Sequence, residues 1–184
     1  MIVLEGIDGC GKSTIARLLA KELNLKVLHF PSKGAEKVRL HLKMKKVFSK
    51  EQLFLLFLSD ILASRSSVSG KVIDRYIYST VAYQHGIFQL NFLEKFFTCL
   101  KFPKPDLVVY LDIPVSVALQ RISGSRMSKS VFERKSYLTN VKREYDKMFA
   151  NQFFGTWLKI DARKNPALIV KEIVGFYRAL RKQK

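Results

Sequence analysis

Cysteine is scarce in this sequence, which contains only Cys10 and Cys99, and long hydrophobic runs are missing. Two cysteines are too few for the disulfide framework of a small secreted protein, so a reducing compartment is expected. The longest continuous apolar segment, Leu53 to Leu58, is much shorter than the roughly 20 residues of a membrane-spanning helix. Because a strand-like segment starts at Met1, no signal peptide is expected, and the sequence predicts a cytoplasmic protein without a membrane segment.

Acidic residues are also few: 15 Asp and Glu stand against 33 Lys and Arg, which gives a net charge of +18. Such an excess is typical of proteins that bind nucleic acids, but it also attracts small polyphosphates. The basic residues are spread along the chain, with local clusters at 37–46 and 178–184, and they do not alternate with aromatic residues as in an RNA-binding surface. A small anionic ligand is therefore the favoured interpretation, and nonspecific binding of polyanions is expected as a side effect.

Strand-like apolar runs alternate with helical patterns along the whole chain, which indicates an α/β fold with a five-stranded parallel sheet flanked by helices. The chain has 184 residues, no linker rich in Pro, Gly or Ser and no internal repeat, so one domain over residues 1–184 is predicted. Strands are predicted at Ile2–Glu5, Lys26–Phe30, Lys71–Asp74, Leu107–Leu111 and Trp157–Ile160. Helices are predicted at Lys12–Leu23, around Ala35–Lys46, and at Lys50–Ser66, Tyr76–Gln84, Leu90–Leu100, Pro114–Ile122, Phe132–Ala150 and Pro166–Lys182, with Pro114 and Pro166 in first turns.

The segment from Gly6 to Ser13 fits the pattern G-x-x-x-x-G-K-[ST] at every fixed position. A short apolar run precedes it, and apolar residues follow it at helical spacing, so the local structure is predicted to be strand, glycine loop and helix. This arrangement points backbone N–H groups and the positive end of a helix dipole at one anion. Lys12 adds a mobile charge for outer phosphates, and the hydroxyl of Ser13 can bind Mg²⁺. The sequence therefore predicts a cradle for nucleotide phosphates.

A second informative pair, Asp74 and Arg75, follows a predicted buried strand. In an open α/β sheet, ligands bind outside the carboxyl ends of the strands, so both side chains are expected beside the phosphate loop. The carboxylate of Asp74 can hold Mg²⁺ directly or through water, and the planar guanidinium of Arg75 suits bidentate recognition of a phosphate.

Taken together, the motifs resemble the thymidylate kinase family, over nearly the whole chain and in the right order. The most specific motifs are Asp74-Arg75-Tyr76 and Ser79 to Gln84, which follow the phosphate loop at 6–14 in the sequence. The others are Phe30-Pro31, Leu55 to Phe57, Tyr110 to Pro114, Phe132-Glu133, Tyr137-Leu138, Tyr145 and Ile160 to Ala162. The resemblance implies the P-loop kinase fold with a short lid, and transfer of the γ-phosphoryl group of ATP to the 5′-phosphate of dTMP with Mg²⁺, in the biosynthesis of dTTP.

The resemblance also implies roles for individual residues. Positions expected to bind ATP are Gly6, Ile7, Asp8, Gly9, Cys10, Gly11, Lys12, Ser13 and Thr14, with Ser13 and Asp74 at the metal. Phe57 is expected to stack on the thymine ring, and Thr80 and Gln84 are expected to contact the edge of that ring. Tyr83 is expected to crowd the 2′ position of the sugar. Asp8 is expected to face the sugar hydroxyl or the metal, and Lys33 and Arg75 to face the acceptor phosphate. The expected catalytic residues are Lys12, Arg75, Asp8 and Arg126.

A polar segment at about 123–131 is the expected lid. Some family members have an Arg in the phosphate loop where this chain has Gly9, and they usually supply the cation from the lid instead. Arg126 or Lys129 would provide it here, and Arg121 on the preceding helix is a further candidate. Closure of a cationic lid excludes water from the transferring phosphoryl group.

The chain departs from the family pattern near the base. Four residues after the stacking Phe, where the family has an Arg for the thymine carbonyl, this chain has Ile61. Arg65, one turn further along the helix, is a hypothetical substitute. The stretch from Asp60 to Asp74 is also shorter than usual by about two helical turns.

Other functions compatible with these motifs are a nucleoside monophosphate kinase for another base, a deoxynucleoside kinase, and a nucleic-acid-binding protein with a relic phosphate loop. A deoxynucleoside kinase more typically has Ser where this chain has Tyr76, and the intact Lys12, Ser13, Asp74 and Arg75 argue against a relic. The resemblance further implies a homodimer that packs through the apolar helices at 50–66 and 90–100.

Overall fold

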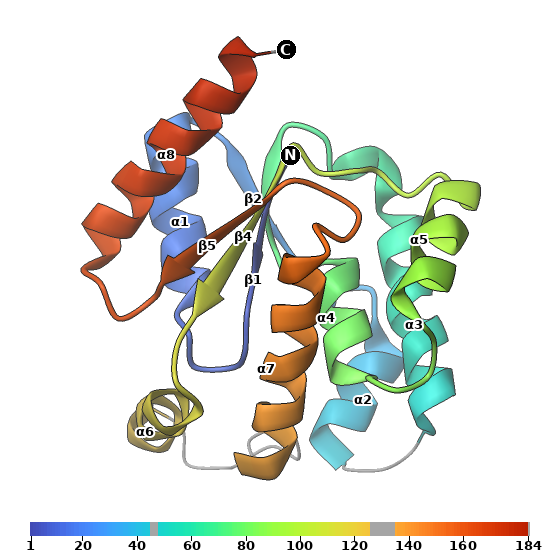
Figure 1. Cartoon of the computed structure of the whole chain (residues 1–184). Coiled ribbons are helices and arrows are strands. Elements are labelled where there is room, and N and C mark those ends of the chain that lie inside the picture. Colours follow the sequence, from blue (N-terminus) through green and yellow to red (C-terminus); the bar gives the residue numbers. More distant parts are fainter. Residues whose placement is uncertain (45–47, 126–134, 184) are drawn as a thin grey trace.

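A parallel β-sheet lies at the centre of the molecule (Figure 1). The structure is a computed structural model that describes residues 1–44, 48–125 and 135–183. The sheet has five strands in the order β2-β3-β1-β4-β5, and every neighbouring pair is parallel. In the register, Val3 of β1 lies opposite Ile73 of β3 and Val108 of β4. The strands are β1 (Ile2–Glu5), β2 (Lys26–His29), β3 (Lys71–Asp74), β4 (Leu107–Asp112) and β5 (Trp157–Asp161).

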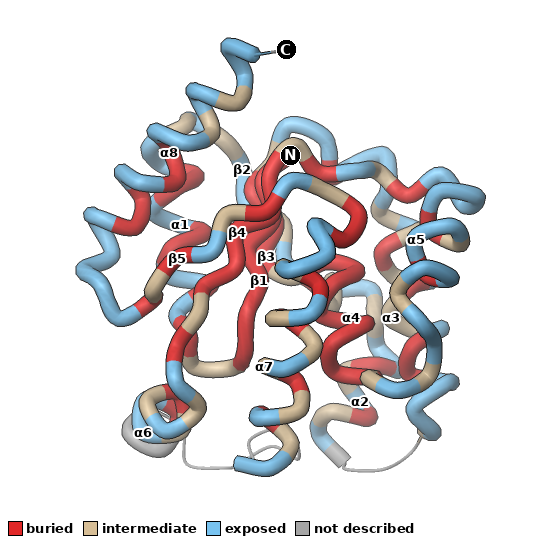
Figure 2. Tube along the Cα trace, viewed as in Figure 1, coloured by how far each residue is buried: buried red, intermediate tan, exposed pale blue. Residues whose placement is uncertain are grey.

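The three inner strands are buried on both faces, which explains why their sequences are almost continuously apolar. Every residue of β1 is buried, as are Val72 to Asp74 of β3 and Leu107 to Leu111 of β4 (Figure 2). The edge strand β2 has mostly exposed side chains instead. Because all the strands run in one direction, the carboxyl ends of β1, β3 and β4 lie together at one edge of the sheet. At this edge each strand is followed by a loop.

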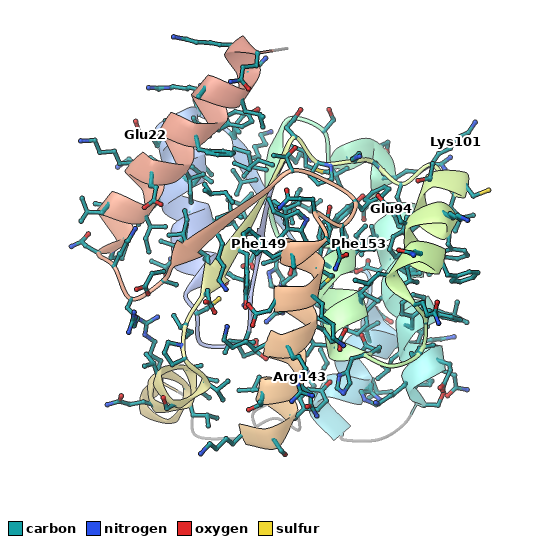
Figure 3. The ribbon with its side chains drawn as sticks, in the orientation of Figure 1. Glu22, Glu94, Lys101, Arg143, Phe149 and Phe153 are labelled. Carbon is teal, nitrogen blue, oxygen red and sulfur yellow. The ribbon has the colours of Figure 1, made fainter. Side chains whose placement is uncertain are left out.

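Helices cover both faces of the sheet. Two of them, α1 and α8, pack against each other on one face, and α3, α4, α5 and α7 lie on the other (Figure 1). In the turn that follows α7, Phe153 (labelled in Figure 3) contacts the rings of Tyr78 and Phe97 and so packs this end of α7 against α4 and α5. The helices are α1 (Lys12–Leu23), α2 (Glu36–Met44), α3 (Lys50–Ala63), α4 (Ile77–Tyr83), α5 (Leu90–Cys99), α6 (Val115–Ser125), α7 (Lys135–Ala150) and α8 (Pro166–Lys182), and η1 (Arg65–Ser67) is a short 3₁₀ turn.

The predicted five-stranded parallel sheet flanked by helices is confirmed, and the bounds of β1, β3, α1 and α8 agree with the prediction. Pro166 opens α8 as expected, and both cysteines are free. In the part of the chain that the structure describes, no helix is both long enough and apolar enough to cross a membrane.

Several predicted helix ends were wrong. Helix α3 stops at Ala63 rather than Ser66, because the run of serines that follows competes for the backbone hydrogen bonds and tightens into η1. Tyr76 is extended and caps α4 instead of joining it. Pro114 precedes α6, which then continues to Ser125 and takes in the first three residues of the predicted lid. The rest of that lid and residues 132–134 of the predicted seventh helix lie outside the described residues, as do residues 45 and 46 of the second.

Candidate active site

The phosphate loop turns sharply between β1 and α1, and two of its glycines are required there by the geometry. Gly6 has φ +141, and a Cβ on it would lie 2.5 Å from the carbonyl oxygen of Leu111. Gly9 has φ +82, and its Cβ would lie 2.6 Å from the carbonyl oxygen of Ala118. Both contacts are shorter than real Cβ atoms make, so only glycine lets the loop lie this close to β4 and α6.

Lys12, the first residue of α1, is buried and bends back over the loop. Its Nζ atom donates to the carbonyl oxygens of Gly6 and Ile7, each at 2.9 Å. These bonds fix a positive charge at the mouth of the loop, next to the N-terminus of α1, where the helix dipole also favours an anion. The loop therefore has the donor groups of a phosphate site.

Asp74, at the carboxyl end of β3, connects the phosphate loop to the neighbouring strand. Its Oδ2 atom accepts a hydrogen bond of 2.6 Å from Ser13 Oγ and lies 3.2 Å from Nδ1 of His29. Burial opposes the ionised form of Asp74, but a hydrogen bond from His29 and the charge of Lys12 outweigh that cost, and the pKa of Asp74 falls to about 2. Asp74 is therefore a carboxylate at neutral pH.

The oxygens of Ser13 and Asp74 fit a Mg²⁺ ion. Oδ1 of Asp74 is buried and makes no hydrogen bond within residues 1–44, 48–125 and 135–183, so one carboxylate oxygen is left for a further ligand. The same ranges contain no group of three or more His, Cys, Asp or Glu that would form an all-protein metal site. Mg²⁺ is typically held by one or two protein oxygens together with waters and substrate phosphates, and this site provides that number.

Arg75 follows Asp74 and adopts a left-handed backbone conformation, with φ 71. Its NH2 group forms an ion pair with Oδ1 of Asp8 in the phosphate loop, and its NH1 group donates to Ser79 Oγ at 3.2 Å. Burial lowers the pKa of Arg75, but the nearby charge of Asp8 outweighs it and the pKa rises well above its ordinary value. The guanidinium lies 5.1 Å from the ring of Tyr83, whose hydroxyl accepts a hydrogen bond of 3.0 Å from the backbone N–H of Asp8. Arg75 is thus fixed at the mouth of the phosphate loop.

A cavity of about 580 Å³ joins these groups. Helix α3 contributes Phe57, which is half-buried and lines the cavity rather than filling the core. Helix α4 contributes Thr80 and Tyr83, and its C-cap residue Gln84 also lines the cavity. Oε1 of Gln84 is buried without a hydrogen bond in the described ranges. The predicted site residues that line the cavity are Asp8, Gly9, Gly11, Lys12, Ser13, Thr14, Phe57, Arg75, Thr80, Tyr83 and Gln84.

Other predicted residues lie elsewhere. Lys33 is exposed on the loop after β2 and does not line the cavity, and the same holds for Arg65, which lies on η1. Ile61 is only 1% exposed and belongs to the core. Arg121 of α6 does line the cavity, and its NH2 group donates to the carbonyl oxygen of Ala162 at 3.2 Å.

The remaining predicted positions are either inside the phosphate loop or not described. Gly6, Ile7 and Cys10 are buried in the loop and support its shape, and Asp74 reaches the cavity edge through Ser13. The two predicted lid cations, Arg126 and Lys129, lie outside the described residues.

Among the residues of the site that sequence reasoning did not assign are Glu5, His29 and Ser79. His29 and Ser79 line the cavity, and Glu5 is buried behind it. Glu5 had a visible signal, because it is the one charged residue in an apolar strand directly before the glycine loop, and Ser79 opens the family-like motif that ends at Gln84. His29 and Ser79 reach the cavity only because β2 and α4 lie next to the phosphate loop in the folded chain.

Comparison with known proteins agrees with this geometry. The model of one protein family, thymidylate kinase, matches residues 4–173. The probable thymidylate kinase of Methanococcus aeolicus is 36% identical over 163 residues, which cover 83% of this chain and 81% of the relative. The thymidylate kinase of Leptospira interrogans serogroup Icterohaemorrhagiae serovar copenhageni is 31% identical over 195 residues, which cover 96% of this chain and 92% of the relative.

Solved structures with the same fold include two kinases. The thymidylate kinase of Candida albicans superposes with a TM-score of 0.75 at 20% identity and covers 100% of this chain and 92% of its own. A deoxyadenosine kinase from M. mycoides superposes with a TM-score of 0.76 at 17% identity and covers 97% of this chain and 98% of its own. At these identities the two likenesses show the fold alone, which is the predicted P-loop kinase fold.

Proposed function

This chain belongs to the thymidylate kinase family, and we propose that it transfers the γ-phosphoryl group of ATP to the 5′-phosphate of dTMP. Membership in the family makes it a phosphotransferase. The observation that carries the proposal is the position of Arg75, whose guanidinium pairs with Asp8 of the phosphate loop and lines the same cavity as Lys12. One pocket thus has a cationic group for each of two phosphorylated molecules.

The donor half of the proposed reaction uses the phosphate loop. Backbone N–H groups at the start of α1 and the ammonium of Lys12 hold the phosphates of ATP and stabilise the charge on the γ-phosphoryl group as it transfers. Ser13 and Asp74 would hold Mg²⁺, and the low pKa of Asp74 keeps its carboxylate ionised for that purpose. Bound Mg²⁺ supplies additional positive charge to the donor phosphates.

The acceptor half uses Arg75. Its planar guanidinium binds the acceptor phosphate through two N–H donors and orients one oxygen toward the γ-phosphorus, which converts a bimolecular encounter into a positioned reaction. The acceptor phosphate is mainly a dianion at neutral pH, because its second pKa is about 6, so an unprotonated oxygen is the nucleophile and no side chain has to remove a proton. Asp8 keeps Arg75 in place and faces the same space.

The base and sugar would bind between α3 and α4. Phe57 offers a half-buried ring for stacking, and Thr80 and Gln84 offer polar atoms for the base edge. The ring of Tyr83 is held by its bond to the backbone of Asp8, and a fixed ring there would crowd a 2′-hydroxyl and favour deoxyribose. These roles rest on the family resemblance together with the position of each residue in the cavity lining.

A second candidate is a nucleoside monophosphate kinase with a different or broader base preference. It is favoured by the burial of Ile61 in the core and by the position of Arg65 outside the cavity lining, since neither residue supplies a cation to the base edge. The first candidate predicts highest kcat/KM with dTMP, and the second predicts turnover with another monophosphate at equal or higher efficiency.

One assay separates the candidates. ADP formation is measured with ATP and a panel of dTMP, dUMP, dCMP, dAMP, dGMP, UMP and CMP, with thymidine and deoxyadenosine as unphosphorylated acceptors. Preference for dTMP supports the first candidate, and turnover of a nucleoside would indicate a deoxynucleoside kinase. No turnover with any acceptor, in a folded protein that binds ATP, would refute both and leave the nucleic-acid-binding alternative.

We also propose a homodimer, because several large apolar side chains are exposed on α3, on α5 and on the loop that precedes α5. Leu55, Phe88 and Phe92 are 61%, 48% and 52% exposed, and the Phe88 ring contacts those of Phe54 and Phe92. Light scattering is expected to give twice the mass of the chain, and Phe92→Asp is expected to give the monomer; a monomeric wild type would refute the proposal. The cytoplasmic location, the lid cation and polyanion binding stay predictions.

A further inference from the structure

Glu5 is a fully buried acidic residue that the mechanism above does not use. It is the last residue of β1, directly before the phosphate loop, and its exposed fraction is 0%. Every other residue of that strand is apolar, and a carboxylate in such a place is costly unless hydrogen bonds satisfy it. The hydrogen-bond partners of Glu5 therefore indicate its role.

Four hydrogen bonds satisfy the Glu5 carboxylate, three from Tyr76 and Ser79 at the start of α4 and one from α7. Oε1 accepts from the backbone N–H groups of Tyr76, at 2.7 Å, and Ser79, at 3.3 Å. Oε2 accepts from the hydroxyls of Ser79, at 2.6 Å, and Tyr145, at 2.8 Å. Tyr145 comes from α7, so Glu5 joins the central strand to α4 and α7 at a single point.

The first pair of bonds caps helix α4. Tyr76, the N-cap residue of α4, makes no side-chain cap hydrogen bond, and two N–H groups at this end of the helix, those of Tyr76 and Ser79, donate to Glu5 instead. Burial raises the pKa of Glu5, and the hydrogen bond from Ser79 and the charge of Arg75 oppose that rise. The helix dipole at this N-terminus also favours the ionised form. Since α4 contributes Thr80 and Tyr83 to the cavity, Glu5 fixes the helix that forms the acceptor wall.

One bond of the second pair, that from the Ser79 hydroxyl, connects Glu5 to Arg75. Ser79 donates its hydroxyl proton to Glu5, which leaves an oxygen lone pair to accept the hydrogen bond of 3.2 Å from NH1 of Arg75. The backbone of Arg75 is held as well, because its N–H donates to Leu4 at 3.2 Å and the next N–H, that of Tyr76, donates to Glu5. The strained left-handed conformation of Arg75 is thus fixed on both sides.

We propose that Glu5 is a positioning residue, which acts through Ser79 and the start of α4 to hold the Arg75 guanidinium in line with the phosphate loop. This inference rests on the proposed role of Arg75 toward the acceptor phosphate. If Glu5 were only structural, its replacement would weaken the use of both substrates and the stability of the protein to a similar extent. A residue that positions Arg75 affects the acceptor and depends on Arg75 being present.

The first test compares Glu5→Gln with the wild type in steady-state kinetics. The amide keeps the size of the side chain, but it removes the charge and places a donor against the Ser79 hydroxyl, so the orientation of that hydroxyl is lost. We expect kcat/KM for dTMP to fall about tenfold, the size of one hydrogen bond to a charged group, while ATP binding by calorimetry changes less than about twofold. Glu22→Gln on the exposed face of α1 (labelled in Figure 3) is the matched control and should behave as the wild type.

A double-mutant cycle decides whether the effect passes through Arg75. In an Arg75→Ala background, Glu5→Gln should cause less than a twofold further loss. An equal tenfold loss in both backgrounds, or equal losses of dTMP use and ATP binding, would overturn the proposal.

Ser79→Ala provides an independent route if Glu5→Gln does not fold. This change keeps the bonds from Glu5 to the backbone of α4 but removes the acceptor of Arg75, and we expect the same selective loss for dTMP and the same dependence on Arg75. A Ser79→Ala enzyme with unchanged dTMP kinetics would overturn the proposal. Failure of the wild type to phosphorylate dTMP would instead refute the proposed function, so the two failures are distinguishable.

Discussion

Two glycines of the phosphate loop offer a controlled test of how tightly the loop packs against α6. Gly9 and Gly11 have similar left-handed backbones, with φ +82 and +96. A Cβ on Gly11 has no atom within 4 Å, whereas a Cβ on Gly9 would lie 2.6 Å from the carbonyl oxygen of Ala118. The substitutions Gly9→Ala and Gly11→Ala therefore share the backbone strain and differ in the steric contact.

The magnitudes follow from those two contributions. An alanine in the left-handed region costs about 1–2 kcal/mol, and part of this is offset because alanine reduces the entropy of the unfolded chain by about 0.4–1 kcal/mol. Both variants bear this cost. Only Gly9→Ala must also shift the backbone of α6, which adds about 1–3 kcal/mol. Gly9→Ala is therefore expected to be less stable than Gly11→Ala by about 2 kcal/mol, or about 4–8 °C in Tm for a chain of this size.

The assay is urea unfolding of the nucleotide-free protein, followed by far-UV circular dichroism. Absence of nucleotide matters because a methyl group on Gly11 would also meet a bound phosphate, which is a separate effect. Equal unfolding free energies for the two variants would refute the argument that contact with Ala118, rather than the left-handed backbone, is what requires glycine at position 9.

Three further predictions concern Lys12, Tyr83 and Asp74. Lys12→Ala should lower kcat by more than a hundredfold and change dTMP binding little, because the ammonium acts on the transferring group; a variant with normal kcat would contradict this. Tyr83→Phe should cost about 1–2 kcal/mol in urea unfolding, since the backbone N–H of Asp8 loses its 3.0 Å acceptor, and an unchanged midpoint would refute that bond. The pKa of Asp74, about 2 against an ordinary 3.8, contributes stability above pH 5 that is lost as the pH falls toward 2. In EDTA, the free energy of unfolding of Asp74→Asn should therefore change with pH by about 2 kcal/mol less than that of the wild type. Parallel plots of unfolding free energy against pH for the two proteins would contradict this.

Much of the fold was predictable from the sequence, because parallel strands buried on both faces are continuously apolar and helices repeat their apolar positions. Where these local signals were strong, as in β1, α1 and α8, the predicted bounds agree with the structure. Where serines or a capping residue compete for backbone hydrogen bonds, as at the end of α3 and the start of α4, the predicted ends were wrong by one to three residues.

The phosphate loop was determined by the sequence alone, because its chemistry depends on residues that are neighbours in the chain. Glycines, a lysine and a serine at fixed spacing suffice to place backbone N–H groups, an ammonium and a hydroxyl around one anion. The carboxyl ends of two strands also had to meet near this loop in a parallel sheet, so Asp74 and Arg75 were predictable as well.

Only the tertiary structure decided which distant residues complete the site. Glu5 contacts Ser79 and Tyr145, which are 74 and 140 residues away in the chain, and His29 reaches Asp74 because β2 and β3 are neighbours in the sheet. Lys33 could not be excluded from the sequence, and its place on an exposed loop became visible only in the fold. A hydrogen bond between residues so far apart depends on strand order and helix packing to within an ångström, and no local pattern of residues encodes that precision.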